Sequence, residues 1–237
     1  MNIEICIHCY RYSKMLNLLL SSYVLHGGNL LSNITHIIYT CEEDPLTISV
    51  CQYFSQHLNI EMRLLPFKNL AARGYGRNLA VSECKSDWIW FSDADHLISK
   101  GSLESLFSIL ENTQMKFVYP WEATKNKNSE DVDHYLETIQ VPNIIDFDFA
   151  TLGMDTAIKH HRIPSGGVQI FKSEYIKQIG YAFRHKSMND WGPCRDDKRA
   201  RKRFYKFFPD SCSKIIIEGH RHLTHKAKRR NDKNAEL

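Results

Sequence analysis

Segments with two kinds of apolar spacing follow each other along the chain. One kind of spacing is typical of strands and the other is typical of helices. Residues 3–9 alternate between apolar and polar side chains and predict a strand, and the spacing in residues 13–26 predicts a helix. Residues 34–40, 46–58 and 60–66 repeat the arrangement as strand, helix and strand. Strands that alternate with helices in this way favour a parallel sheet with right-handed crossovers.

One apolar run ends in two carboxylates. Residues 88–91 are apolar without alternation, which predicts a strand buried on both faces, and Asp93 and Asp95 follow where that strand would leave the sheet. Ligands of open α/β sheets bind beyond the carboxyl ends of strands, and an Asp-x-Asp can hold a divalent cation through its oxygens. Short acidic tripeptides also cap helices or face water, but the position after a buried strand favours the cation site.

A glycine-rich basic segment precedes this strand. Residues 71–80 predict a loop that runs into a helix reaching about Cys84. Glycines permit close approach of the backbone to a ligand, and Arg73 and Arg77 could neutralise a diphosphate. The segment has neither Walker spacing nor a dinucleotide fingerprint, which argues against those two nucleotide folds.

The second half of the chain contains further strands and helices. Residues 99–112 predict a helix, residues 116–121 a strand, and residues 214–218 another strand. A glycine pair at 166–167 leads into a strand. The polar stretch 122–133 predicts an exposed or mobile loop of the kind that often carries acceptor recognition.

Composition narrows the possible classes of protein. The chain has 237 residues, of which 43% are hydrophobic and 24% charged, and this is typical of one globular domain with appendages. Its 7 cysteines are odd in number and scattered, which argues against a disulfide framework. The first residues do not resemble a secretory signal, so a cytoplasmic location is the default expectation.

Positive charge gathers late in the chain although the net charge is only +4. The segments 198–206 and 226–233 are densely basic and suit anionic lipid head groups, a phosphorylated acceptor or nucleic acid, or simply form a solvated helix face. Aromatic-basic nucleic-acid motifs are absent, which argues against nucleic acid.

Three blocks of residues then occur in a fixed order. Asp93-Ala94-Asp95 comes first, Gly166-Gly167 with Trp191-Gly192 and Asp196-Asp197 follows, and His220, His222 and His225 come last. This set resembles nucleotide-sugar glycosyltransferases of the GT-A fold, particularly family 2 and the galactosyl- and N-acetylgalactosaminyltransferase families. An Arg-Asn helix start precedes the Asp-x-Asp strand in those families, as Arg77-Asn78 does here.

The resemblance covers residues 1–226 and implies an α/β fold, in which helices flank a mixed, mostly parallel sheet within a single domain. Residues 1–97 would form the nucleotide-sugar-binding half and residues 98–226 the acceptor-binding and catalytic half. Residues 227–237 would be a basic polar tail.

The resemblance also implies a metal-dependent reaction. Mn²⁺ or Mg²⁺ would be held by Asp95 and a late histidine, in the order of preference His225, His222 and His220, with Asp93 nearer the ribose or a metal-bound water. A carboxylate would accept the proton of the acceptor hydroxyl. One residue more than the usual spacing separates Trp191-Gly192 from the acidic pair, so Asp196, which is favoured, and Asp197 both stay candidates for this base.

Substrate-binding residues follow from the same resemblance. A nucleotide-sugar donor, with a UDP-sugar favoured, would contact Tyr10, Arg11, Glu42, Asp44, Arg73, Arg77, Asp93 and Ala94. A glycan or lipid-linked acceptor would contact Gly166, Gly167, Trp191 and Gly192, and transfer would proceed with inversion. A nucleotidyltransferase and a non-catalytic module that binds through the basic end are the alternatives; residues 9–12 lack the glycine that the nucleotidyltransferase signature carries near the first strand.

Overall fold

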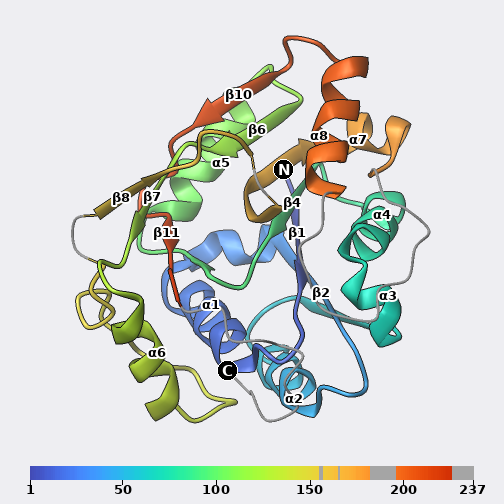
Figure 1. Cartoon of the computed structure of the whole chain (residues 1–237). Coiled ribbons are helices and arrows are strands. Elements are labelled where there is room, and N and C mark those ends of the chain that lie inside the picture. The colour runs from blue at the N-terminus through green and yellow to red at the C-terminus, as the bar shows by residue number, and fades with distance from the viewer. Residues whose placement is uncertain (155–156, 165, 182–195, 226–237) are drawn as a thin grey trace.

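The computed structural model of the chain describes residues 1–154, 157–164, 166–181 and 196–225. Seven strands form the main sheet in the order β10-β6-β9-β4-β1-β2-β3, and Figure 1 shows β4 and β1 near its centre. β9 runs antiparallel to β4 and β6, and the other pairs are parallel, which confirms the predicted mixed, mostly parallel sheet. These strands are β1 (Ile3–His8), β2 (Ile34–Thr40), β3 (Ile60–Leu64), β4 (Trp88–Ser92), β6 (Phe117–Pro120), β9 (Gln169–Lys172) and β10 (Cys212–Ile215).

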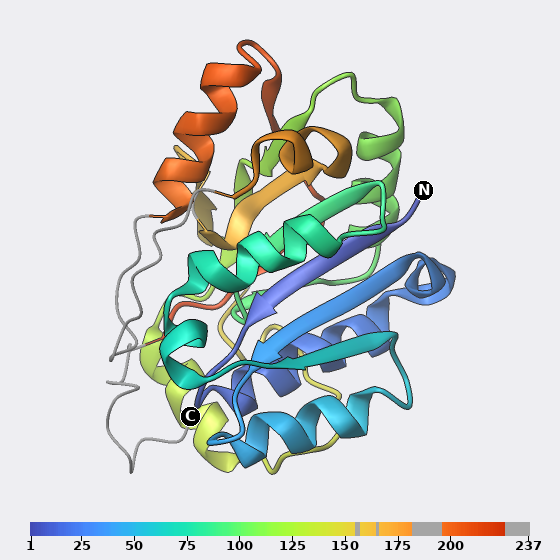
Figure 2. The same cartoon turned by 90° about the vertical axis from the view of Figure 1, so that its right-hand side faces the viewer.

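Helices cover both faces of this sheet, and Figure 2 shows the layers from the side. The core on one face contains residues of α1 (Ser13–His26), α2 (Pro45–Phe54) and α5 (Ser102–Asn112), and α6 (Ser129–Thr138) adds Val132 and Leu136 to it. Four others contribute to the core on the opposite face: α3 (Phe67–Ala71), α4 (Arg73–Glu83), α7 (Ser173–Ile179) and α8 (Asp196–Phe207). Two short 3₁₀ turns, η1 (Gly28–Asn33) and η2 (Gly166–Val168), complete the connections.

The apolar run before the acidic pair forms β4, and all five of its residues are buried. Trp88 and Trp90 belong to the core beneath α1 and α5, whereas Ile89 and Phe91 belong to the core beneath α4 and α8. Successive side chains of a strand point to opposite faces, so a strand covered on both sides has to be apolar throughout. The predicted burial on two faces is confirmed.

A second, four-stranded sheet lies beside the first, in the order β5-β11-β7-β8. Its strands are β5 (His96–Leu97), β7 (Glu122–Lys125), β8 (Ala157–His160) and β11 (Arg221–His222). The sequence pattern gives no indication of this sheet, because two of its strands contain only two residues each and are too short to show a periodicity.

The prediction of a loop at residues 122–133 is wrong. Residues 122–125 form β7, which is paired on one side with β11 and on the other with β8. Residues from 129 onward form α6 (Ser129–Thr138), where the Asn128 side chain caps the start by accepting from Glu130 N at 3.0 Å. α6 buries only Val132 and Leu136, so its apolar content is too low to stand out in the sequence.

The loop predicted at the start of residues 71–80 is shorter than expected, since α4 already begins at Arg73, and the helix predicted to reach about Cys84 is confirmed. Gly74 and Gly76 lie inside this helix and are buried. A Cβ atom at position 76 would collide with the His8 ring at the end of β1. The glycine therefore serves the close packing of α4 against β1 and does not mark a turn.

Two further features of the described residues bear on class and compartment. The six cysteines among them are free thiols, in agreement with their scatter in the sequence. None of the helices in this part of the chain has both the length and the apolar character that crossing a bilayer requires.

The buried histidine at position 36 predicts acid sensitivity of the fold. Its ring packs edge-on against Tyr23, and burial lowers the pKa of His36 from 6.5 to about 4. The unfolded chain therefore takes up a proton near pH 6.5, while the folded chain resists until about pH 4, and stability falls as the pH falls through this interval. His36→Leu should remove up to about 3 kcal/mol of that loss.

The measurement is urea unfolding at a series of pH values from 7.5 to 4 in wild type and His36→Leu. The exposed His57 supplies the matched control, because His57→Leu should retain the full dependence on pH. An unchanged slope in His36→Leu would contradict the assignment.

Candidate functional site

Parallel pairing brings the acidic pair to the edge of the main sheet. β1 and β4 are neighbours in register, with Ile7 opposite Ser92, so the chain after His8 and the chain after Ser92 leave the sheet side by side. Asp93 and Asp95 thus lie at the edge where the carboxyl ends of β1, β2 and β4 meet, which is where α/β sheets bind ligands.

Histidines of the second sheet surround Asp95. β5 and β11 pair antiparallel with His96 opposite His222, and their rings stack with centroids 4.4 Å apart. His96 Nε2 lies 3.8 Å from Asp95 Oδ1, and His222 Nε2 lies 3.5 Å from Asp95 Oδ2. His225 Nε2 lies 3.9 Å from Asp95 Oδ2 and also contacts the Tyr12 hydroxyl.

Electrostatics keep these groups in the state that metal binding requires. Burial acts to raise the pKa of Asp95, but the hydrogen bond from His222 and the nearby imidazoles of His96 and His225 outweigh it and lower that pKa. Burial lowers the pKa of His96 well below its ordinary value and that of His220 to about 3. At neutral pH the site therefore combines an ionised carboxylate at Asp95 with neutral imidazoles at His96 and His220.

The donor set fits a divalent cation. One ligand atom from each of Asp95, His96 and His222 lies within 4.8 Å of the others. Asp95 Oδ1 is buried and has no hydrogen-bond partner. A buried carboxylate oxygen without a donor is costly unless a cation neutralises it, so the residues present match the expected metal. Asp95 and His222 belong to the predicted set, and His96 was not predicted.

A lysine also reaches this cluster. Lys159, on β8, places its Nζ 2.7 Å from His222 Nδ1. Burial lowers the pKa of Lys159, while the charge of Asp95 acts to raise it. Lys159 thus places an ammonium group beside the histidine cluster.

A buried arginine joins the two acidic motifs. The Arg77 side chain is 1% exposed, contacts Asp197 at the start of α8, and lies 3.6 Å from Asp93 Oδ1. The Tyr181 hydroxyl accepts from Arg77 at 3.1 Å and is 2.9 Å from Asp197 Oδ1. Burial acts to lower the pKa of Arg77, but Asp197, Tyr181 and Asp93 raise it well above its ordinary value. The guanidinium thus stays charged between the two carboxylates.

Asp196 differs from Asp197 in its surroundings. It is buried, and its Oδ1 accepts from Arg199 one turn along α8 at 3.0 Å. The Asp93 side chain is 42% exposed, and its pKa is raised because its carboxyl group is partly withdrawn from water and lies close to Asp95, against the opposing charge of Arg77. Asp93 is therefore the more accessible carboxylate of the Asp-x-Asp.

The glycine pair lies directly against this site. A Cβ atom at Gly167 would stand 2.8 Å from both Asp93 Oδ2 and His96 Nε2. The Gly167 carbonyl accepts from Trp90 Nε1 at 3.3 Å. Gly167 therefore leaves the room that Asp93 and His96 occupy, and Gly166 begins the adjoining turn η2. Trp191 and Gly192, the other expected acceptor residues, lie outside the described residues.

The expected base-binding residues line the sheet edge beside Asp93. A cleft of about 340 Å³ opens after β2 and β3 and is lined by Cys41, Glu42, Glu43, Leu64, Leu65, Pro66 and Phe67. The Tyr10 ring packs on Phe67 with centroids 4.6 Å apart, and the Arg11 guanidinium lies over Tyr10. Asp44 caps α2 and accepts from Arg11 N at 2.6 Å, so this carboxylate holds the loops together. Two other residues of the expected donor-binding set lie nearby in the sequence of elements: Arg73 is the first residue of α4, and Ala94, between the two aspartates, is buried.

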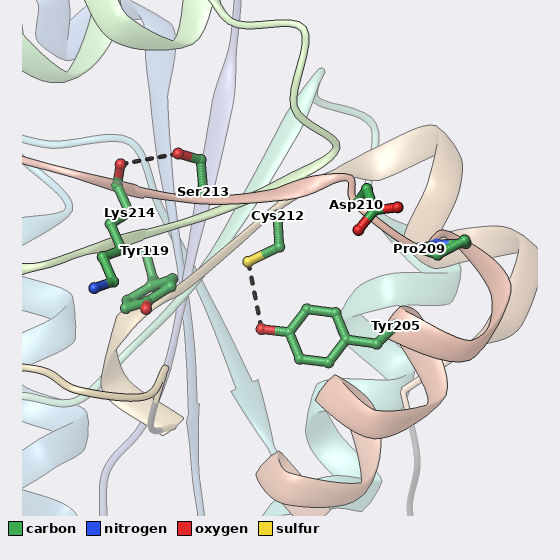
Figure 3. A pocket seen from close by; sticks show the side chains of 7 residues that line it. All are labelled: Tyr119, Tyr205, Pro209, Asp210, Cys212, Ser213 and Lys214. Carbon is green, nitrogen blue, oxygen red and sulfur yellow. Dashed lines mark hydrogen bonds between the residues drawn. The ribbon is translucent and has the colours of Figure 1, made fainter.

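A cleft of about 410 Å³ lies elsewhere, between α8 and β10 (Figure 3). Tyr205 on α8 and Cys212 on β10 point toward each other and form a hydrogen bond of 3.4 Å. The cleft shares no residue with the histidine cluster or with the Arg77 network, so its size alone does not make it the functional site.

Comparison with known proteins agrees with this geometry. The sequence profile of glycosyl transferase family 2 matches residues 37–180, which is more than half of the chain. The chain belongs to glycosyl transferase family 2. No curated protein sequence is significantly similar to it.

Solved structures share the GT-A fold of this family 2 chain. TarS residues 1–349 from S. aureus match at 15% identity and a TM-score of 0.65, over 95% of this chain and 60% of that chain. The same fragment with UDP-GlcNAc matches at 12% and 0.68, over 99% and 62%. The mannosyltransferase PcManGT from Pyrobaculum calidifontis, with GDP-Man and Mn²⁺, matches at 12% and 0.57, over 96% and 58%. The chain thus spans about 60% of the length of these structures.

Three of the residues that sequence reasoning missed in this family 2 chain belong to strands it did not predict or directly follow one of them. His96 and Lys159 lie on strands of the second sheet, and His161 follows β8 with its ring 5.6 Å from that of His222. Gln169 and Tyr181 complete the Arg77 network. Only His96 carries a signal in the sequence, because it directly follows Asp95.

The Arg77 network predicts a large effect on stability. Arg77→Met removes the cation from the partly buried carboxylate of Asp197, and loss of one partner of a buried pair typically costs about 3–5 kcal/mol. Urea unfolding should show this loss in the single variant. The double variant Arg77→Met/Asp197→Asn should lose less than the sum of the two single variants. A loss below about 1 kcal/mol in Arg77→Met would mean that the pair behaves as an exposed one.

Proposed function

We propose that this glycosyltransferase is metal-dependent and moves a sugar from a nucleoside-diphosphate sugar, with a UDP-sugar favoured, to a hydroxyl of a glycan or lipid-linked acceptor, with inversion. The observation that carries the proposal is the ionised Asp95 between the imidazoles of His96 and His222 at the edge of the sheet. The cleft after β2 and β3 opens at the same edge. A nucleoside diphosphate would place its nucleobase in that cleft and its charged diphosphate near Asp95.

Two structural relatives support the class of donor. The TarS fragment is described with UDP-GlcNAc and PcManGT with GDP-Man. Phe67, with Tyr10 packed against it, offers aromatic surface to a base, and Glu42 at the rim can accept from a base N–H.

The metal would be held by Asp95 and His222, with His96 close enough to join them. A divalent cation such as Mn²⁺ or Mg²⁺ bound there would offset the charge of the diphosphate leaving group. His222 replaces His225 as the preferred late histidine, because its Nε2 is nearer to Asp95, at 3.5 Å against 3.9 Å. Late histidines are also the feature on which the resemblance to galactosyl- and N-acetylgalactosaminyltransferases rests.

Asp197 is the better candidate for the base that accepts the proton of the acceptor hydroxyl. Arg77 joins it to Asp93, so Asp197 belongs to the same edge as the Asp-x-Asp. The Asp197 side chain is 20% exposed, whereas that of Asp196 is 9% exposed and engaged with Arg199. A base must reach its substrate, and Arg77 and Tyr181 would hold Asp197 in a fixed orientation for that purpose.

The basic face of α8 offers contact with an anionic acceptor. Lys198, Lys202, Arg203 and Lys206 are exposed along the helix that begins with Asp196 and Asp197. A phosphorylated or lipid-linked acceptor would be attracted to this face, and an anionic membrane surface would be attracted in the same way. The basic residues after position 225 lie outside the described residues.

Donor binding should stabilise the protein only when the site is intact. UDP with Mn²⁺, at about one hundred times its dissociation constant, should add about 2.7 kcal/mol and raise the melting temperature by about 5 °C or more. Asp95→Asn should abolish this shift, because the carboxylate charge is lost. The exposed Asp146 gives the matched control, and Asp146→Asn should retain the shift.

The measurement is thermal unfolding with UDP, GDP and other nucleoside diphosphates, each with and without Mn²⁺. The absence of a shift with every nucleoside diphosphate would count against the proposed donor class. A shift with GDP alone would correct the nucleotide and leave the reaction class intact.

Substitutions of the two neighbouring aspartates should have different effects on turnover. Asp197→Asn should lower turnover at least about tenfold, since general bases typically contribute 10²–10⁴-fold, while the affinity for donor stays close to that of wild type. Asp196→Asn is the matched control and should change turnover far less. The readout is initial-rate transfer or donor hydrolysis, and the reverse ranking would assign the base to Asp196.

A further inference from the structure

Hydrogen bonds fix which nitrogen of His96 carries a hydrogen. His220 Nδ1 lies 3.4 Å from the Glu122 carbonyl oxygen, which can only accept, so Nδ1 donates. A neutral His220 therefore has no hydrogen on Nε2, and this nitrogen accepts from His96 Nδ1 at 3.1 Å. His96 in turn presents the lone pair of its Nε2. The relay from Glu122 through His220 to His96 resembles the outer partners that orient metal-ligating histidines.

That lone pair faces another electron-rich atom. His96 Nε2 lies 3.8 Å from Asp95 Oδ1, and this oxygen is buried and lacks a hydrogen-bond partner. Two acceptors that face each other without a hydrogen between them repel, and a shared cation makes the same arrangement favourable. Metal–nitrogen and metal–oxygen bonds of about 2.0–2.2 Å allow both atoms to bind one ion at this separation.

Lys159 acts against cation binding. Its ammonium donates to His222 Nδ1 at 2.7 Å, which leaves the ring hydrogen of His222 on Nε2, on the side of Asp95. For His222 to become a ligand through Nε2, that hydrogen must move to Nδ1 and Lys159 must withdraw from it. Lys159 also adds a positive charge at the site. It therefore lowers the affinity for any cation.

We infer that His96 is a metal ligand positioned by His220, and that the centre formed by Asp95, His96 and His222 selects Zn²⁺, Co²⁺ or Mn²⁺ over Mg²⁺. The inference rests on the proposed function only in taking this cluster as the metal site of the transferase. Two imidazoles and one carboxylate suit first-row transition metals, and affinity rises from Mn²⁺ toward Co²⁺ and Zn²⁺. Mg²⁺ prefers an octahedron of oxygens and keeps its waters, so two imidazoles serve it poorly.

Direct metal titration of the chelator-treated protein, without nucleotide or acceptor, tests the selection. Zn²⁺ and Co²⁺ should bind at least about one hundredfold tighter than Mg²⁺. The affinity for Mn²⁺ should lie between that for Mg²⁺ and those for Zn²⁺ and Co²⁺. Bound Co²⁺ should show visible absorption typical of nitrogen ligands. Equal affinity for Mg²⁺ and Zn²⁺ in the wild-type protein would overturn the inference without the use of any variant.

Variants then test each residue by the affinity and absorption of Co²⁺. His96→Asn should weaken Co²⁺ binding at least about tenfold and change its spectrum, and His220→Phe should weaken binding about 10–100-fold through loss of the orienting partner. Lys159→Met should strengthen binding, because the competing ammonium is gone. The exposed His57 supplies the control, and His57→Asn should leave affinity and spectrum unchanged. Circular dichroism and thermal unfolding establish that each variant is folded.

The outcomes separate this inference from the proposed function. A wild-type Co²⁺ spectrum and affinity in folded His96→Asn would remove His96 from the ligands, even if the protein transfers sugar from UDP-sugars. Conversely, metal selection that depends on His96, found together with failure to bind any nucleoside diphosphate, would leave the inference standing while the proposed donor falls.

Discussion

Two residues of antiparallel pairing, between β5 and β11, hold the site together. They place His96 opposite His222, although 125 positions separate these residues in the chain, and the Leu223 amide adds a hydrogen bond of 2.8 Å to the Asp95 carbonyl. β5 is thus fixed to the acidic motif that precedes it, and β11 brings the late histidines close to that motif. β7 supports β11 from its other side and supplies the Glu122 carbonyl that orients His220. The short second sheet therefore determines the position of imidazoles that no single element could bring together.

The buried groups of the site also lower the stability of the fold, and the rest of the structure must offset this loss. Burial keeps His96, His161 and His220 neutral, and Asp95 keeps an oxygen without a hydrogen donor. Such groups are unfavourable in a folded protein unless a ligand satisfies them, so a cation in this place would contribute to stability as well as to chemistry. The apolar cores on both faces of the main sheet provide the stability against which this cost is set.

The sequence was most informative where burial is repetitive. The uninterrupted apolar run of β4 predicts its two covered faces, and the alternation of β1 predicts the neighbouring strand, so the edge that carries Asp93 and Asp95 could be located in advance. Prediction failed where a residue's role depends on a distant partner. Gly76 looks like a loop residue until the His8 ring packs against it, and the polar residues of β7 look like a loop until strands pair on both sides. Arg77 was expected to meet a diphosphate, but the structure places its guanidinium, 1% exposed, against Asp197.

Tyr181 has one hydroxyl hydrogen and two acceptors within reach, Asp197 Oδ1 at 2.9 Å and Gln169 Oε1 at 3.0 Å. While Asp197 is ionised, that hydrogen is best used on the carboxylate. Once Asp197 has accepted a proton, a small rotation of the hydroxyl redirects the hydrogen to Gln169, and the oxygen of Tyr181 can accept from the new carboxylic acid. The network can therefore exchange one set of hydrogen bonds for another with little movement of heavy atoms, so that a change of charge at Asp197 need not disturb the buried groups around it.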